Sequence, residues 1–170
     1  MGIGIRKQWV AAGALMSALL WAVPATAALN MYLTIKGSKQ GSIKGDGASG
    51  TIPIKAVTHD VVMASDHASG MASGKRQHGT ITITKEIDRA SPMLFQALNS
   101  HEVLSDVNIG SQTSGSGAGK IVQTIELKDA VISGIRKSGN EELITLDYDT
   151  IQVTHVDGSK SATDDWEAPK

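Results

Sequence analysis

Cysteine is absent from all 170 residues of the sequence, which excludes both a disulfide framework and thiolate chemistry. Aromatic residues are also scarce, at 4% of the chain, whereas glycine occurs 18 times. Few large rings are therefore available to fill an interior, and many positions favour turns. We expect a small core of aliphatic side chains that is divided by many turns.

An excess of charge of either sign is also missing. The chain has 16 basic and 17 acidic residues, a formal net charge of −1 and a pI near 6.5. Such a balance gives no electrostatic reason to expect nucleic acid or an anionic membrane surface as a partner. The length of 170 residues suits one domain with a core of its own.

The N-terminal segment differs in composition from the remainder of the chain. Arg6 and Lys7 precede an apolar run over residues 9–23, which ends at Pro24. Ala25-Thr26-Ala27 then provides the small side chains that signal peptidase requires. This three-part pattern predicts a secretory signal peptide that is cleaved after Ala27.

Residues 1–27 are therefore assigned to a signal peptide, and residues 28–170 to one secreted domain that is released to the periplasm or beyond. Two other interpretations of the N-terminal segment stay open. The segment could anchor the chain in a membrane, although its apolar run is short for a bilayer span. Alternatively, Met31 is the true first residue, and the protein is then cytoplasmic before its secretion.

Alternation of apolar and polar residues with a period of two predicts strands on both sides of one helix. Ile81 and Ile83, for example, alternate with threonines, and such β-branched side chains favour a pleated surface. Stretches rich in glycine and serine predict the connections. The predicted strands are residues 31–36, 52–64, 79–85, 102–109, 121–128, 130–136 and 143–153, and the predicted loops are residues 37–50, 65–77 and 110–119.

The apolar positions change parity within the last of these strands, residues 143–153. Apolar residues alternate regularly up to Tyr148 and then continue from Ile151 in the opposite parity. We expect a β-bulge near residues 149–150, because half of the strand would otherwise face the wrong way.

One helix is predicted from Ser91 onward. The Ser91 side chain can accept a hydrogen bond from an N–H of the first turn, and Pro92 suits the first helical position. Leu94 and Ala97 lie on a narrow apolar stripe, and the helix should end near Asn99 after roughly two or three turns. The elements together predict a mainly β fold, a barrel or a sandwich, and we favour a small antiparallel β-barrel with one short α-helix.

No arrangement of residues in the sequence supports catalysis or metal binding. Residues 115–120 resemble a phosphate-binding loop, but Ser114 replaces its first glycine and Ile121 replaces the hydroxyl residue that binds Mg²⁺. No two histidines have a metal-ligand spacing, and no G-x-S-x-G elbow supplies a nucleophile. We therefore predict that the chain is not an enzyme and has no catalytic, cofactor-binding or metal-binding residue. The histidines, interpreted as surface or loop residues, are His59, His67, His78, His101 and His155.

The most informative stretch joins a predicted strand to the predicted helix and reads Thr84-Lys85-Glu86-Ile87-Asp88-Arg89-Ala90-Ser91-Pro92. Considered alone, its four charged residues are the solvated charges of a turn. The order T-K-x-x-D-x-x-S-P, followed by an apolar helix, nevertheless resembles the haemolysin-coregulated proteins, the tube subunits of bacterial type VI secretion. Residues 31–37, 74–78 and 164–167 resemble further segments of the same family.

The resemblance implies a six-stranded barrel with one helix that assembles as a hexameric ring. Such rings stack into a tube that is propelled together with a spike and cargo. The implied partners are therefore further copies of the chain, the spike, the sheath and effector cargo, with no nucleic acid and no stable membrane insertion. Neither catalysis nor a cofactor is implied. The signal peptide departs from the family pattern, because the apparatus collects its tube subunits from the cytoplasm.

Three functions are consistent with these features. The first is an exported structural ring or tube subunit of type VI secretion. The second is a Sec-exported ring-forming or adhesive binding protein that uses the same fold outside the apparatus, since a fold does not determine a function. The third is an exported β-rich enzyme, which would need a pocket with a perturbed acid–base pair. Neighbouring genes for a contractile sheath and spike would favour the first function over the second.

Overall fold

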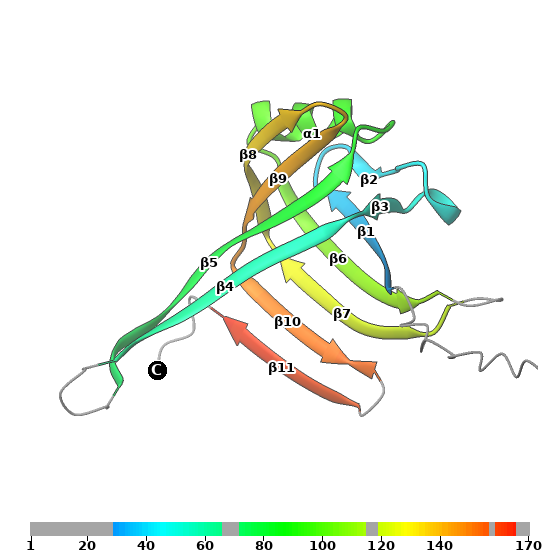
Figure 1. Cartoon of the computed structure of the whole chain (residues 1–170). Helices are drawn as coiled ribbons and strands as arrows, with labels where there is room; N and C mark the ends of the chain where they lie inside the picture. Colours follow the sequence, from blue (N-terminus) through cyan, green and yellow to red (C-terminus); the bar gives the residue numbers. More distant parts are fainter. Residues whose placement is uncertain (1–28, 66–71, 115–118, 157–158, 166–170) are drawn as a thin grey trace, which may run out of the picture.

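The chain folds into one curled antiparallel sheet with a short helix across one end (Figure 1). The structure is a computed structural model that describes residues 29–65, 72–114, 119–156 and 159–165. Within these residues the sheet has eleven strands. The mainly β class and the small antiparallel barrel with one short α-helix are thus confirmed, and the barrel is open along one side.

The elements follow one another in a simple order. A short 3₁₀ turn, η1, lies between the second and third strands, and the α-helix follows the longest hairpin. Their bounds are β1 Leu29–Gly37, β2 Gly41–Ile43, η1 Ala48–Gly50, β3 Ile52–Ile54, β4 Ala56–Ser65, β5 Ala72–Glu86, α1 Ser91–Asn99, β6 Val103–Thr113, β7 Ile121–Lys128, β8 Ala130–Ser138, β9 Glu141–Asp147, β10 Thr150–His155 and β11 Lys160–Asp165.

The strand order along the sheet is β11-β10-β7-β6-β8-β9-β5-β4. β1 lies off this path, where it pairs with β6 over most of its length and also with β2 and β3. β4 and β5 form a long twisted hairpin that projects beyond the rest of the sheet (Figure 1). The curved sheet surrounds the hydrophobic core, which lies between strands from the two ends of this path.

The core consists of the aliphatic side chains that the alternation predicted. Leu33 on β1 and Ile81 and Ile83 on β5 are fully buried, and Leu94 and Ala97 of α1 close the end of the same cluster. The helix spans nine residues, ends at Asn99 as predicted, and packs mainly against β8. A helix this short is marginal alone, so its stability comes from this packing.

The predicted bulge near residues 149–150 is wrong, because residues 143–153 do not form one strand. β9 ends at Asp147 and pairs with β5 and β8, whereas β10 begins at Thr150 and pairs with β7 and β11. Between them the chain turns from one half of the sheet to the other. Tyr148 is buried at this corner, and the Asp149 N–H donates to the Lys128 carbonyl. The change of parity therefore reflects a corner.

Several predicted loops contain strands, so the sheet has more strands than the seven that the alternation predicts. β2 and η1 occupy part of residues 37–50, β5 begins at Ala72 inside the second predicted loop, and β6 continues to Thr113. The predicted strand 52–64 is interrupted at Lys55, and β11 forms in the acidic tail. Where a predicted loop forms a strand, cross-strand pairing determines the structure although the glycine and serine content locally favours turns.

Candidate functional site

The described part of the chain holds no grouping of three His, Asp or Glu side chains suited to a metal ion. His59 Nε2 lies 2.7 Å from the Tyr148 hydroxyl oxygen, a pair that joins β4 to the β9–β10 corner. His67 and most of the phosphate-loop-like segment lie outside the described residues, and the His78 side chain is not described. No helix among the described residues is long and apolar enough to cross a membrane.

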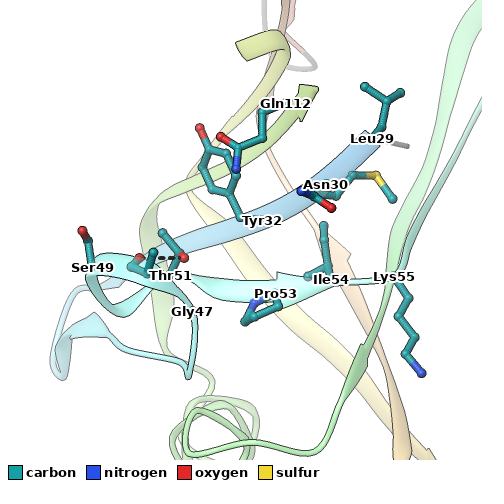
Figure 2. A pocket seen from close by; sticks show the side chains of 12 residues that line it. Leu29, Asn30, Tyr32, Gly47, Ser49, Thr51, Pro53, Ile54, Lys55 and Gln112 are labelled. Carbon is teal, nitrogen blue, oxygen red and sulfur yellow. Dashed lines mark hydrogen bonds between the residues drawn. The ribbon is translucent and has the colours of Figure 1, made fainter. Parts of the chain in front are cut away.

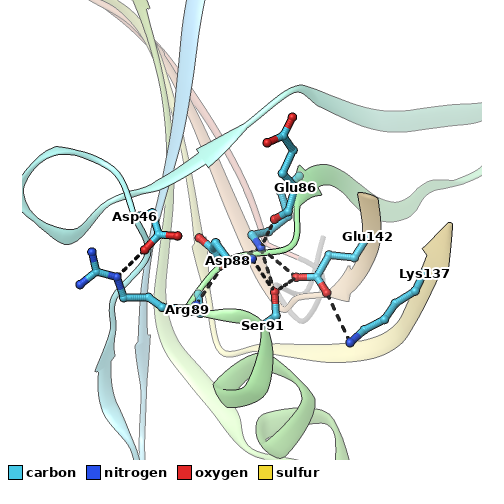
Figure 3. A network of polar contacts seen from close by, with 9 residues as sticks. Asp46, Glu86, Asp88, Arg89, Ser91, Lys137 and Glu142 are labelled. Atoms are coloured by element: carbon cyan, nitrogen blue, oxygen red, sulfur yellow. Dashed lines mark hydrogen bonds and ion pairs between the residues drawn. The ribbon is translucent and has the colours of Figure 1, made fainter. Parts of the chain in front are cut away.

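A buried ionic cluster holds the corner between β5 and α1 (Figure 3). Lys85 is fully buried, and its Nζ lies 2.7 Å from Asp88 Oδ1 and 2.8 Å from Glu142 Oε1 on β9. The same nitrogen donates to the Glu86 carbonyl at 2.6 Å. Lys85 and Asp88 are therefore structural, and the expectation that they are solvated turn charges is wrong. Glu86 and Arg89 are exposed as expected.

Ser91 belongs to this cluster instead of capping the helix by the predicted contact. The helix cap is Ala90, and no cap side chain makes a hydrogen bond there. The Ser91 hydroxyl donates to Glu142 Oε1 at 2.5 Å and accepts the Asp88 N–H at 3.1 Å. Asp88 Oδ1 in turn accepts the Ala90 N–H at 2.9 Å. The T-K-x-x-D-x-x-S-P order thus brings three members of one polar cluster to a single corner.

Two carboxylate oxygens of the cluster are buried without a hydrogen-bond partner among the described residues, namely Asp88 Oδ2 and Glu142 Oε2. Asp88 Oδ2 faces Gly45, where an added Cβ would lie 2.8 Å away. Glu142 Oε2 lies 4.0 Å from Lys137 Nζ at the surface. The cluster therefore depends on the Lys85 ammonium, because its loss would leave two carboxylates buried without a counter-charge.

A further buried carboxylate, Glu102, ties the β1–β2 turn to the end of α1. Its Oε1 accepts the Lys39 and Gln40 N–H groups at 2.7 and 2.8 Å, and its Oε2 accepts Gln40 Nε2 at 2.8 Å. Gly37 leaves the space that the carboxylate occupies. Burial disfavours the charged form, but the donors of Gln40 and Lys39 outweigh it and lower the pKa of Glu102.

Exposed ion pairs surround the corner. Lys55 Nζ lies 2.7 Å from Glu141 Oε1 and 2.9 Å from Glu86 Oε1, and these carboxylates raise the pKa of Lys55. Arg89 Nε lies 2.6 Å from Asp46 Oδ1 and lowers the pKa of Asp46. All of these groups are solvated, so each pair contributes little to stability.

An open cavity of about 680 Å³ lies beside β1 and β3 (Figure 2). Its lining mixes apolar side chains with neutral polar groups and one ammonium group, and none of these groups is a nucleophile paired with a base. The lining residues are Leu29, Asn30, Met31, Tyr32, Gly47, Ala48, Ser49, Thr51, Pro53, Ile54, Lys55 and Gln112. A perturbed acid–base pair that would favour an enzyme is not found in this cavity.

The strands at the two ends of the sheet path are the features best suited to pairing with another chain. Among the described residues, β4 pairs only with β5, and β11 pairs only with β10. Each therefore presents a row of backbone donors and acceptors on its outer edge, which favours pairing with another chain. Val61 on β4 is half exposed, so this edge is also partly apolar. The two edges are different surfaces of one molecule.

Comparison with known proteins gives one consistent result. The profile of a family described as "Type VI secretion system effector, Hcp" matches residues 32–155. The "Major exported protein" of Pseudomonas aeruginosa is 32% identical over 164 residues, an alignment that covers 81% of this chain and 95% of that protein.

Solved structures agree with the sequence comparison. The Hcp1 protein from the E. coli EAEC 042 pathovar superposes with a TM-score of 0.74 at 25% identity, and the match covers 82% of this chain and 99% of that one. The secreted protein Hcp3 from Pseudomonas aeruginosa superposes with a TM-score of 0.69 at 30% identity, covering 81% and 99%. Both relatives are thus matched along almost their whole length.

Proposed function

The chain belongs to the Hcp family of type VI secretion proteins, and from this premise we propose that it is an exported structural subunit that assembles into a hexameric ring. Stacked rings would form a tube that meets the spike, the sheath and effector cargo of the apparatus. The observation that carries the proposal is the match over residues 32–155, combined with nearly full coverage of both solved relatives.

The outer edges of β4 and β11, which pair with no further strand among the described residues, support assembly into a closed ring. A ring of identical subunits repeats one heterologous interface, so each subunit must present two different surfaces that complement each other. β4 and β11 lie at opposite ends of the sheet path and would provide such a pair of surfaces. Pairing them between neighbouring copies would satisfy the backbone groups that a single copy leaves exposed.

A structural, non-enzymatic role is supported by the position of the ionisable groups. Lys85, Ser91 and Glu142 are within hydrogen-bond reach of one another, but all three are buried and no substrate can reach them. The large cavity brings together no acid–base pair. A structural ring subunit would need neither a cofactor nor a metal ion.

The oligomeric state tests this proposal. We expect residues 29–170, purified and examined by analytical ultracentrifugation at roughly ten to fifty micromolar, to sediment as a ring of six subunits. Val61→Lys should weaken the ring, because a lysine on an edge strand opposes pairing with another strand. Val103→Lys is the matched control, since Val103 is also exposed but lies on β6, which is paired on both edges. A monomer at every concentration would contradict the proposal.

We further propose that residues 1–27 are a cleaved signal peptide and residues 28–170 the single mature domain. Mass spectrometry of the native protein should then identify Ala28 as the first residue. Ala27→Phe should block cleavage and leave a precursor at the inner membrane, because signal peptidase needs a small side chain there. A native N-terminus at Met31, or unchanged processing of Ala27→Phe, would favour the cytoplasmic route through the apparatus.

The signal-peptide pattern also favours a second candidate function, a Sec-exported ring-forming or adhesive protein that works outside the apparatus. Deletion of the contractile sheath gene distinguishes the two functions. Release of a tube subunit should stop in the deletion strain, whereas release of a Sec-exported protein should continue. The same strain with Ala27→Phe is the control, since that substitution should stop only the Sec route.

A further inference from the structure

The short strand β3 is paired along one edge. Among the described residues its strand partner is β1, and its middle residue, Pro53, is exposed and has no N–H to donate. Ile52 and Ile54 on either side are buried in the core, so the ends of β3 are anchored by their side chains. The position of the backbone from Pro53 to Lys55, however, also depends on the contacts of Lys55, the residue that follows β3.

Empty space borders this segment on two sides. The open cavity of about 680 Å³ is lined by Pro53, Ile54 and Lys55 from one side. A second cavity of about 340 Å³ is lined by the same three residues together with Asp46, Glu86, Ile87 and Asp88. The exposed side chains of Pro53 and Lys55 border these cavities and can move without displacing packed neighbours, whereas Ile54 is packed in the core.

Lys55 connects residues 53–55 to neighbouring strands. Its N–H donates to the Thr84 carbonyl at 2.8 Å. Its ammonium reaches Glu86 Oε1, at the end of β5, and Glu141 Oε1, at the start of β9, at 2.9 and 2.7 Å. One side chain therefore joins the end of β3 to two other strands. Because all three side chains are about half exposed, salt screens their attraction.

We propose that Lys55 is a salt-sensitive latch that fixes the junction of β3 and β4 to the end of β5 and the start of β9. When the latch opens, the backbone around Lys55 becomes more mobile, while the Ile54 side chain stays in the core. The root of the β4–β5 hairpin is loosened at the same time, because β4 begins at the next residue and β5 ends at Glu86. This device is independent of the proposed tube function.

Hydrogen exchange of the backbone amides tests the latch in the full mature chain. Lys55→Met keeps the length of the side chain but removes both ion pairs. We expect the amides of residues 52, 54 and 55 to exchange about 3- to 10-fold faster in this variant than in the wild type. Lys128→Met is the matched control, since it removes the Lys128–Asp106 pair, which is equally exposed but lies on β7 and β6. The control should leave these three amides unchanged.

The dependence of amide exchange on salt concentration is the second part of the test. Raising the NaCl concentration from about 0.05 M to about 1 M should accelerate exchange of the three amides in the wild type and have little effect in Lys55→Met. Both proteins are compared in the same oligomeric state, confirmed by sedimentation. Equal exchange in the wild type and Lys55→Met, an equal effect of Lys128→Met, or a salt effect that persists in Lys55→Met would each overturn the proposal. None of these results depends on ring formation.

Discussion

Lys85 Nζ lies 2.8 Å from Glu142 Oε1, although 57 positions separate the two residues in the chain. The two residues are cross-strand partners in the register of β5 and β9, and both are buried. Neither charge has water to solvate it, so each depends on the other. The corner before α1 and the start of β9 therefore have to form together.

Lys85→Met tests this dependence. The substitution removes the ammonium and leaves the carboxylates of Asp88 and Glu142 buried without a counter-charge, so unfolding in denaturant should show a loss of about 3–5 kcal/mol. Lys128→Met, which breaks an exposed ion pair, should cost at most about 1 kcal/mol. Similar losses in the two variants would mean that Lys85 is solvated.

Glu102→Gln should change how stability depends on pH. The pKa of Glu102 in the folded chain lies below its ordinary value of 4.5, so its carboxylate stabilises the fold above that value. This contribution is lost as the pH falls below 4.5 through the folded pKa. The variant should therefore be less stable than the wild type near neutral pH, and the difference should shrink as the pH falls below 4.5. Thermal melts over this pH series measure it, and a constant difference would contradict the assignment.

Gly45→Ala should destabilise the fold through a direct clash. A Cβ at this position would lie 2.7 Å from the Ile52 Cα, which is backbone and cannot rotate away, and 2.8 Å from Asp88 Oδ2. We expect a loss of about 1–3 kcal/mol in denaturant unfolding. Gly134→Ala is the control, because its Cβ would meet nothing nearer than Thr145 at 3.9 Å. The control should change stability by less than about 1 kcal/mol.

The parts of the fold that depend on local sequence could be predicted. Strict alternation in residues 31–36 and 79–85, and the apolar stripe from Leu94, identify β1, the second half of β5 and α1, although β5 begins at Ala72 instead of residue 79. The parity change after Tyr148 was visible too, but alternation alone does not distinguish a bulge within a strand from a corner between two strands. Only the pairing partners of β9 and β10 make that distinction.

The burial of the cluster around Lys85 could not be predicted from the sequence. Lys85, Asp88 and Ser91 are close in the sequence and were noticed as a motif, but charges beside a turn are normally solvated. Their burial depends on Glu142, whose position is set by the register of β9 against β5. Glu102 was missed in the same way, because its donors come from the distant β1–β2 turn. In both cases the missing information was which distant strand or turn lies beside the residue in the folded chain.

Ser91→Ala and Leu94→Ala separate the polar and apolar contributions of the helix start. Ser91→Ala leaves the Asp88 N–H without its acceptor and Glu142 without a hydroxyl donor, so it should cost about 1–3 kcal/mol. Leu94→Ala creates a cavity in the core and should cost about 2–5 kcal/mol, because Leu94 is fully buried. Denaturant unfolding measures both losses.

A double-mutant cycle identifies the role of Ser91. If Ser91 stabilises the chain through Glu142, then Ser91→Ala and Glu142→Gln should not add, and their coupling energy should reach about 1 kcal/mol or more. Ser91→Ala combined with Lys128→Met is the control pair, because those residues have no partner in common and their effects should add within about 0.5 kcal/mol. Additive effects in the first pair would mean that Ser91 acts through its hydrogen bond with the Asp88 N–H and not through Glu142. Non-additive effects would show that the serine of the T-K-x-x-D-x-x-S-P segment joins the helix to β9.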